Sequence, residues 1–223
     1  MHFLLVHGTT QSSEGWRLLI DELSALGHSA ATTDLVSFGE VTTATDYGQA
    51  VAAELSGARI DVVVAHSGSG LLLPAIAAAT HATMQVYLAA FVPNGSESLM
   101  DEINDGATTV FNADWIGVDP TRSEADARRF LFHDCNPDIA DWAVTTLRLF
   151  MPAAVYSERV QQSPMVPAMA IVPEGDRTLR PRWMIAAARE RLGVEATIVP
   201  GGHCPHVSRP KDIARKLGTV HAG

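Results

Sequence analysis

A serine, an acid and a histidine occur in this chain at positions where they could act together as a nucleophile, an orienting group and a base. Ser67 follows a β-branched apolar run at residues 62–64, and an alanine-rich helical segment comes after it. This pattern is typical of a tight strand-to-helix turn that exposes a serine hydroxyl, usually written Gly-x-Ser-x-Gly. Here Ala65 and Ser69 stand at the outer glycine positions. The pentapeptide alone is therefore equally compatible with an ordinary serine-rich turn.

Two further residues that this chemistry needs follow later apolar runs. Asp176 comes after the run at residues 168–173, and His203 comes after the run at residues 196–200. A serine hydroxyl is a weak nucleophile until a base takes its proton, which an imidazole can do near neutral pH. A carboxylate beside the imidazole orients it and stabilises its charged form. We therefore predict Ser67, Asp176 and His203 as nucleophile, acid and base.

A tetrahedral intermediate would also need hydrogen-bond donors for its oxyanion. The backbone N–H of Gly68 directly follows the serine, and the N–H of Thr9 lies on the loop after the first apolar run. These two groups are the predicted donors. Four further residues are predicted to contact the substrate: Gly8, Thr10, Trp115 and Trp142.

Each catalytic role has an alternative candidate. Ser69 is the alternative nucleophile, but Leu71 would then fill a crowded position that requires a small residue. Glu174 is the alternative acid, and we prefer Asp176 because a glycine turn lets the shorter side chain reach back. His206 is the alternative base and is expected to be structural, as it lies beside a proline.

Other reactive side chains receive structural interpretations. His7 and His66 end apolar runs and are expected to pack or to orient their neighbours. Cys204 adjoins the predicted base and is expected to form part of the pocket wall. The sequence His133-Asp134-Cys135 contains metal-ligating residue types, but its spacing matches no helix-borne or paired-ligand motif. We therefore predict no metal site.

Apolar runs that alternate with helical patterns must position these residues. Strands are predicted at residues 3–7, 29–33, 62–66, 84–89, 168–173 and 196–200, and helices at residues 14–26, 43–55, 68–79, 182–192 and 210–217. Strands that are apolar on both faces indicate an α/β protein with a mostly parallel, doubly wound sheet of about six strands. Ligands bind at the carboxyl ends of the strands in such a sheet, where the loops converge.

Residues 95–163 interrupt this alternation. They show no strand pattern and indicate several short helices that are rich in aromatic residues. We predict a helical cap over a core formed by residues 1–94 and 164–223. The aromatic side chains of the cap favour an apolar ligand.

Composition limits the partners of the protein. The chain has 223 residues, 47% of them hydrophobic and 18% charged, which is enough for a sizeable core. Its net charge of −9, with no basic cluster longer than Arg128-Arg129, argues against nucleic acid and anionic membranes. No apolar stretch suits a membrane span or a signal peptide, and two cysteines suggest free thiols. We expect a cytoplasmic protein that acts on a small molecule without a cofactor, and a homodimer is compatible with the sequence.

Together these motifs resemble the α/β-hydrolase superfamily, and more closely its plant methylesterase and hydroxynitrile lyase branch with that branch's bacterial relatives. The resemblance is carried by residues 3–8, 15–16, 65–67, 86–93, 175–178 and 202–203, with Pro210. It implies a sheet that begins at the third strand of the fuller superfamily fold, with a helical cap. It also implies the triad Ser67, Asp176 and His203, and no metal or cofactor.

The same resemblance favours hydrolysis over lyase chemistry. The lyases tend to carry threonine after the first-loop histidine and lysine directly after the catalytic histidine, where this chain has Gly8 and Cys204. We expect cleavage of a small carboxylic ester, thioester or lactone with an apolar acyl group through an acyl-enzyme. Two alternatives stay open. One is a tailoring enzyme of the same fold (a C–C lyase, cyclase or decarboxylase) with His203 as base, and the other is a non-catalytic small-molecule receptor.

Overall fold

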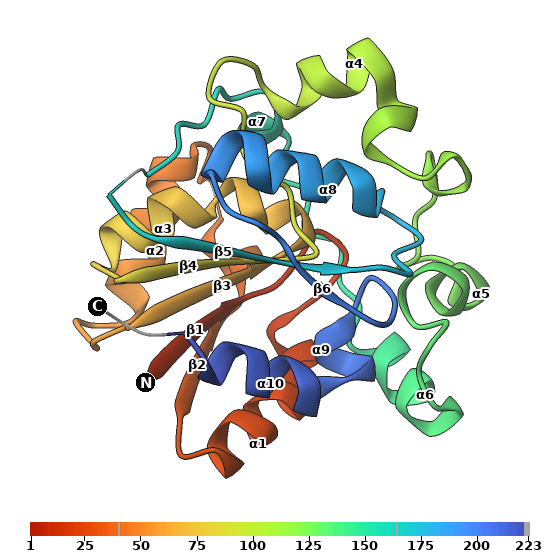
Figure 1. The fold of residues 1–223 in the computed structure, drawn as a ribbon, viewed down its shortest axis with the longest axis horizontal. Helices are drawn as coiled ribbons and strands as arrows, with labels where there is room; N and C mark the ends of the chain where they lie inside the picture. The colour runs from red at the N-terminus through yellow and green to blue at the C-terminus, as the bar shows by residue number, and fades with distance from the viewer. Residues whose placement is uncertain (40, 164, 221–223) are drawn as a thin grey trace.

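A six-stranded sheet in which all neighbouring strands are parallel runs through the centre of the molecule (Figure 1). The computed structural model describes residues 1–39, 41–163 and 165–220. In spatial order the strands are β2 (Ser29–Thr33), β1 (His2–Val6), β3 (Val62–His66), β4 (Met84–Leu88), β5 (Ala168–Pro173) and β6 (Thr197–Val199). The predicted α/β class and the six-stranded sheet are confirmed.

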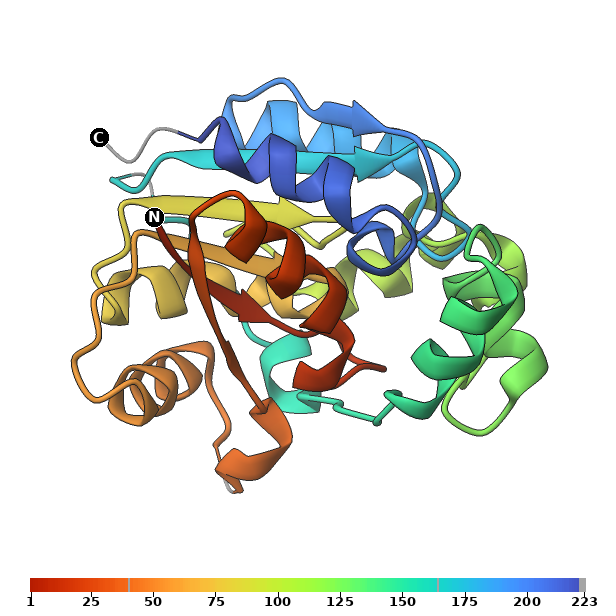
Figure 2. The ribbon, with the colours of Figure 1, turned by 90° about the horizontal axis from the view of Figure 1, so that it is seen from below.

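Helices cover both faces of this sheet because successive strand residues point to opposite sides. Phe3 and Leu5 of β1 pack in the same buried cluster as α1 (Arg17–Ala25) and α10 (Pro210–Gly218). The intervening residues of β1 pack on the opposite face, against α2 (Ala44–Glu54), α3 (Leu73–Ala79) and α8 (Pro181–Ala187). Figure 2 shows the sheet between these two layers.

Three predicted helices are divided in the structure. The helix predicted at residues 14–26 begins as a 3-10 turn at Ser13–Trp16, and α1 follows it. The segment that follows β3 begins with a 3-10 turn at Ser67–Leu71, and α3 starts only at Leu73. Pro74 explains the delay, because proline lacks an N–H and fits only the first turn of an α-helix. Helix α8 likewise gives way to a π-helical turn at Ala188–Leu192. The short helix α9 (Pro205–Ser208) was not expected from the sequence.

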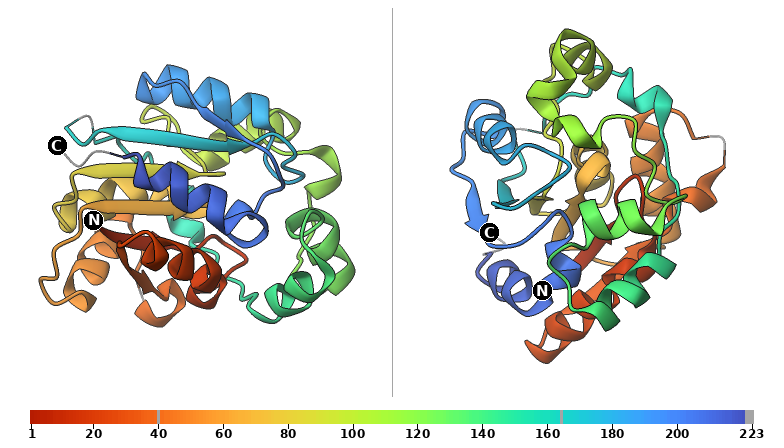
Figure 3. Two further views of the ribbon diagram at one scale, coloured as in Figure 1. Left: turned by 60° about the horizontal axis from the view of Figure 1, so that its bottom comes forward. Right: turned by 90° about the vertical axis from the view of Figure 1, so that its right-hand side faces the viewer.

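Helices connect β4 to β5, and the part of this connection around residues 113–145 lies beyond the carboxyl ends of the strands (Figure 3). They are α4 (Leu99–Val110), α5 (Glu124–Asp126), α6 (Pro137–Thr145) and α7 (Ala153–Tyr156), with a 3-10 turn at Ala113–Trp115 and a π-helical turn at Ala127–Leu131. Apolar residues of this segment extend the core of the sheet, among them Leu99 and Val155. The division into a core and a cap domain stays a prediction. None of the described helices is both long and apolar enough to cross a membrane.

Candidate active site

Ser67 lies on a sharp turn between β3 and the 3-10 turn that follows it. Its φ angle of +55° is in the left-handed region, which is strained for a residue with a side chain. Strain of this kind costs on the order of 1–3 kcal/mol and is held in place by surrounding packing. The turn brings the serine hydroxyl out at the carboxyl edge of the sheet, where it lines a cavity.

Close backbone contacts fix this turn. A Cβ atom at Gly8 would lie 2.8 Å from the Ser67 Cβ, and one at Gly70 would overlap the carbonyl oxygen of Phe91. A close backbone approach after the serine is therefore at Gly70, one residue later than the small position expected from the sequence. Ser69 is buried, and its hydroxyl donates to the carbonyl oxygen of His7. The alternative nucleophile is thus already hydrogen-bonded elsewhere.

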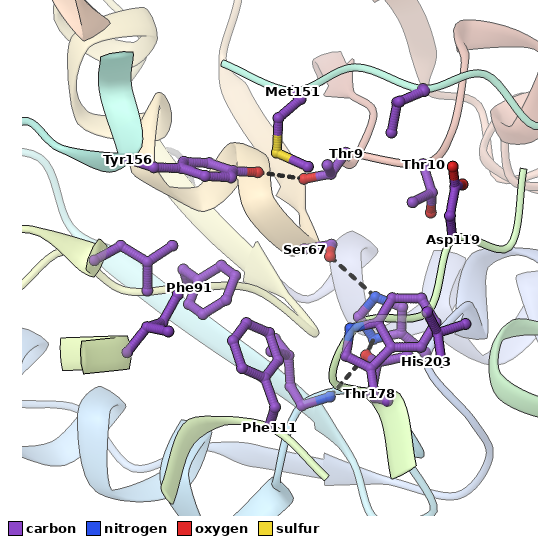
Figure 4. Close-up of a pocket in the computed structure, with 16 residues that line it drawn as sticks. Thr9, Thr10, Ser67, Phe91, Phe111, Asp119, Met151, Tyr156, Thr178 and His203 are labelled. Atoms are coloured by element: carbon purple, nitrogen blue, oxygen red, sulfur yellow. Dashed lines mark hydrogen bonds between the residues drawn. The ribbon is translucent and has the colours of Figure 1, made fainter. Parts of the chain in front are cut away.

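His203 lies between a hydroxyl and a carboxylate. Its Nε2 atom is 3.0 Å from the Ser67 Oγ (Figure 4). Its Nδ1 atom is 2.7 Å from the Asp176 Oδ2. Both His203 and Asp176 are buried. The loops after β5 and β6 bring them to Ser67, whereas Glu174 is exposed and takes no part. An imidazole in this position can accept the serine proton and later return it.

Thr178 is a member of this network that sequence patterns did not single out. Its hydroxyl lies 2.8 Å from the His203 Nδ1 and 3.0 Å from the Asp176 Oδ1. The backbone N–H groups of Thr178 and Leu179 also donate to the Asp176 Oδ1, over 2.7 and 3.1 Å. These contacts hold the carboxylate in one orientation. The available signal was the short turn at residues 175–178, which carried part of the family resemblance.

The other buried histidines are structural. His66 donates from its Nε2 to the carbonyl oxygen of His203 over 2.9 Å, and the His206 Nε2 lies 3.1 Å from the Gln11 Oε1. Burial lowers the pKa of His66 far below its ordinary value and that of His206 to about 3. Both rings are therefore neutral near pH 7. His7 accepts from the Leu35 N–H and donates to the Gly8 carbonyl oxygen, so it orients the loop after β1.

His133 and Asp134 connect the segment between β4 and β5 to the loops that carry Asp176 and His203. The His133 Nε2 donates to the Gly175 carbonyl oxygen over 3.1 Å. The Gly202 N–H donates to the Asp134 Oδ2 over 2.9 Å. Cys204 is not part of the pocket wall. Its sulfur accepts from the Gln11 amide, and burial raises the pKa of its thiol.

A cavity of about 250 Å³ opens in front of Ser67 and His203. Most of its walls are apolar, which suits a small apolar ligand. It is lined by Thr9, Thr10, Ser67, Phe91, Leu99, Ile103, Phe111, Trp115, Val118, Asp119, Leu149, Met151, Tyr156, Thr178, Leu179 and His203. Several of these side chains are drawn in Figure 4.

Of the four residues predicted to contact the substrate, two line the cavity and two do not. Thr10 and Trp115 line the cavity, whereas Gly8 lies behind Ser67. Trp142 is turned away, under the guanidinium group of Arg17 at 4.3 Å. The direction of a tryptophan in a helical segment could not be assigned from the sequence. In the structure the buried residues of α6, Ala140 and Ala143, pack against Leu131 and Val207 and do not line the cavity.

The predicted oxyanion donors, the N–H groups of Thr9 and Gly68, lie beside Ser67. The Thr9 N–H has no hydrogen-bond acceptor within the described part of the chain. The Gly68 N–H belongs to the first turn of the 3-10 helix, where N–H groups have no partner within the helix. Both residues adjoin Ser67, so the two groups could hold an oxyanion formed at that serine.

Comparison with known proteins places this arrangement in context. Residues 3–216 match the family described as "Alpha/beta hydrolase family". Polyneuridine aldehyde esterase is similar in structure, with 17% identity, 97% of each chain covered and a TM-score of 0.79. A methylesterase from Arabidopsis gives 18% identity, 97% of each chain and a TM-score of 0.73. A pyrethroid hydrolase from Sphingobium faniae gives 16% identity, 98% of this chain, 96% of its own and a TM-score of 0.75. A search of curated protein sequences gave no match.

Proposed function

Because the chain belongs to the α/β-hydrolase family, we propose that it is a serine hydrolase that cleaves a small carboxylic ester through an acyl-enzyme. One observation carries the proposal. The Ser67 hydroxyl, the His203 imidazole and the Asp176 carboxylate form a continuous hydrogen-bonded chain at the wall of an apolar cavity. This geometry suits transfer of a proton from the serine as its oxygen attacks a carbonyl carbon.

In the acylation step, the Ser67 Oγ would attack the ester carbonyl while the His203 Nε2 takes its proton. The carbonyl oxygen becomes an oxyanion that the N–H groups of Thr9 and Gly68 would hold. Collapse of this intermediate breaks the bond to the alcohol, which leaves with the proton from His203. Losing one such oxyanion donor typically costs about 10²–10³ in rate.

In the deacylation step, a water molecule would give a proton to His203 and attack the acyl-serine. Collapse of the second intermediate releases the carboxylic acid and returns the proton to Ser67. A thioester or a lactone would follow the same sequence, with a thiol or the open end of the product as leaving group. The mainly aromatic and aliphatic lining of the cavity supports an apolar acyl group.

The proposal is tested by covalent labelling and turnover. A fluorophosphonate should modify Ser67, located by mass spectrometry of the digested protein, and the protein should hydrolyse short p-nitrophenyl esters. Ser67→Ala should abolish labelling and lower kcat/KM at least ~10³-fold. The matched control is Ser69→Ala, which removes the neighbouring hydroxyl that donates to His7. It should still be labelled at Ser67.

The same experiment separates the alternatives. Substantial activity in Ser67→Ala would point to a reaction in which His203 acts as base without an acyl-enzyme. Tight binding of a small ligand, recovered unchanged and without any turnover, would point to a receptor. The cavity lining supports hydrolysis over lyase chemistry, because the described residues around it include no lysine or arginine that could stabilise a departing anion.

A further inference from the structure

Two hydroxyl groups form a pair at the wall of the cavity, next to the predicted oxyanion donors. Thr9 lies on the loop after β1, and Tyr156 ends helix α7, 147 residues along the chain. The Thr9 Oγ1 and the Tyr156 phenol oxygen are hydrogen-bonded to one another, and both residues line the cavity with Ser67 (Figure 4). The reaction described above uses the backbone of Thr9 but neither hydroxyl.

One of the two hydroxyl protons of this pair takes no part in the hydrogen bond between Thr9 and Tyr156. Two hydroxyl groups carry two protons, and the hydrogen bond between them uses one, whichever oxygen donates. Within the described part of the chain neither hydroxyl has another hydrogen-bond partner. Burial raises the pKa of Tyr156 to about 12, so the phenol keeps its proton near pH 7. One O–H group is therefore available to an acceptor on a ligand.

The position of the pair indicates which ligand atom would accept this hydrogen bond. A Cβ atom added at Gly68 would overlap both hydroxyl oxygens. The glycine after the nucleophile thus makes room for the pair, and the two oxygens pack against the residue whose N–H is a predicted oxyanion donor. Because both hydroxyl oxygens pack against Gly68, a carbonyl oxygen held by the Gly68 N–H would lie close to the pair.

We propose that the hydroxyl pair of Thr9 and Tyr156 supplies a third hydrogen-bond donor to the substrate carbonyl oxygen, in addition to two backbone N–H groups. This inference rests on the proposed function of the site. A hydroxyl donor strengthens its bond as negative charge develops on the oxygen, so the pair would act mainly on the transition state. Its loss should lower kcat more than it raises KM.

The test removes the hydroxyl groups without removing the backbone donor. Thr9→Val keeps the shape of the side chain and its N–H, and Tyr156→Phe keeps the ring. Each single variant retains one O–H group, so each should lose only a few-fold in kcat. The double variant should lose about 10²-fold in kcat on a short p-nitrophenyl ester, with KM changed less than about threefold. Tyr47→Phe is the matched control, because Tyr47 is a buried tyrosine that packs on Phe150 outside the cavity.

A second measurement tests the donor without turnover. The infrared carbonyl band of bound acetophenone should lie at lower frequency in the wild type and in Tyr47→Phe, and should shift upward in the double variant. Should the double variant not fold, Tyr156→Phe is measured in the same way and should shift partway. An unchanged band, or an unchanged kcat in a folded double variant, overturns the inference. A wild type with the shifted band but no ester turnover contradicts the proposed function and leaves the donor supported.

Discussion

Asp119 gives the cavity its only acidic side chain among the described residues that line it. Its Oδ1 atom accepts from the N–H and the hydroxyl of Thr121, over 3.0 and 2.6 Å, which holds the side chain in place. A fixed carboxylate at the wall of an apolar cavity disfavours a second negative charge nearby. A repulsion of ~1 kcal/mol corresponds to about a fivefold effect on rate.

We therefore expect the protein to prefer uncharged esters to esters that carry a free carboxylate. Asp119→Asn keeps the acceptor for Thr121 and removes the charge. It should raise the ratio of kcat/KM for a p-nitrophenyl hemisuccinate to that for the butyrate about fivefold. Asp114→Asn is the control, because Asp114 is on the same connection but pairs with Arg129 outside the cavity. A ratio that is equal in both variants would show that Asp119 does not set this preference.

Helix α4 supplies one wall of the cavity, and a largely buried ion pair fastens it to the core. Arg191 donates from its two terminal nitrogens to the two carboxylate oxygens of Glu102, over 2.9 and 2.8 Å. It also donates to the Val92 carbonyl oxygen and lies over the Trp183 ring. The two charged side chains are only 17% and 11% exposed. Removal of one partner would leave the other charge poorly solvated.

Glu102→Gln should therefore lower the free energy of unfolding by ~2 kcal/mol, measured by urea denaturation. The matched control is Glu190→Gln, whose carboxylate is 3.7 Å from Arg189 in a pair that is 66% and 65% exposed. That change should cost less than ~0.5 kcal/mol, because water already solvates both charges. Equal losses in the two variants would contradict a special role for the pair with Arg191.

The elements also show what the sequence could and could not predict. Ser67 directly follows β3, and Asp176 and His203 lie within four residues of the ends of β5 and β6. Strand ends in a parallel sheet converge, so local patterns were enough to bring these residues together. Tyr156 reaches the cavity from a one-turn helix whose position depends on packing with residues far along the chain. For the same reason, the sequence could not show that the Trp142 side chain points away from the cavity. No periodicity in residues 95–163 determines which side chains turn toward the strand ends.

At the scale of the whole molecule, buried imidazole rings connect folding to pH. His66 packs between His203 and His206, with ring centroids 4.7 Å apart in both pairs, and Trp16 covers His206 at 4.3 Å. Burial lowers the pKa of His7, His66 and His206. These rings fold as neutral groups, and protonation of His66 or His206 would place a charge in the core without a carboxylate to compensate it.

This burial predicts that the protein loses stability as the pH falls below 6.5, the ordinary pKa of histidine. Between about 3, the pKa of folded His206, and 6.5, the unfolded chain binds a proton that the folded protein does not. Stability therefore rises with pH in this window, by ~1.4 kcal/mol per pH unit for each such ring. Urea unfolding of His206→Gln between pH 6 and 4.5, where the unfolded ring is mostly protonated, should show a slope that is smaller by nearly this amount. The amide can still donate to Gln11. His81→Gln changes an exposed imidazole and should keep the wild-type slope. An unchanged slope in His206→Gln would mean that its ring is already protonated in the folded protein.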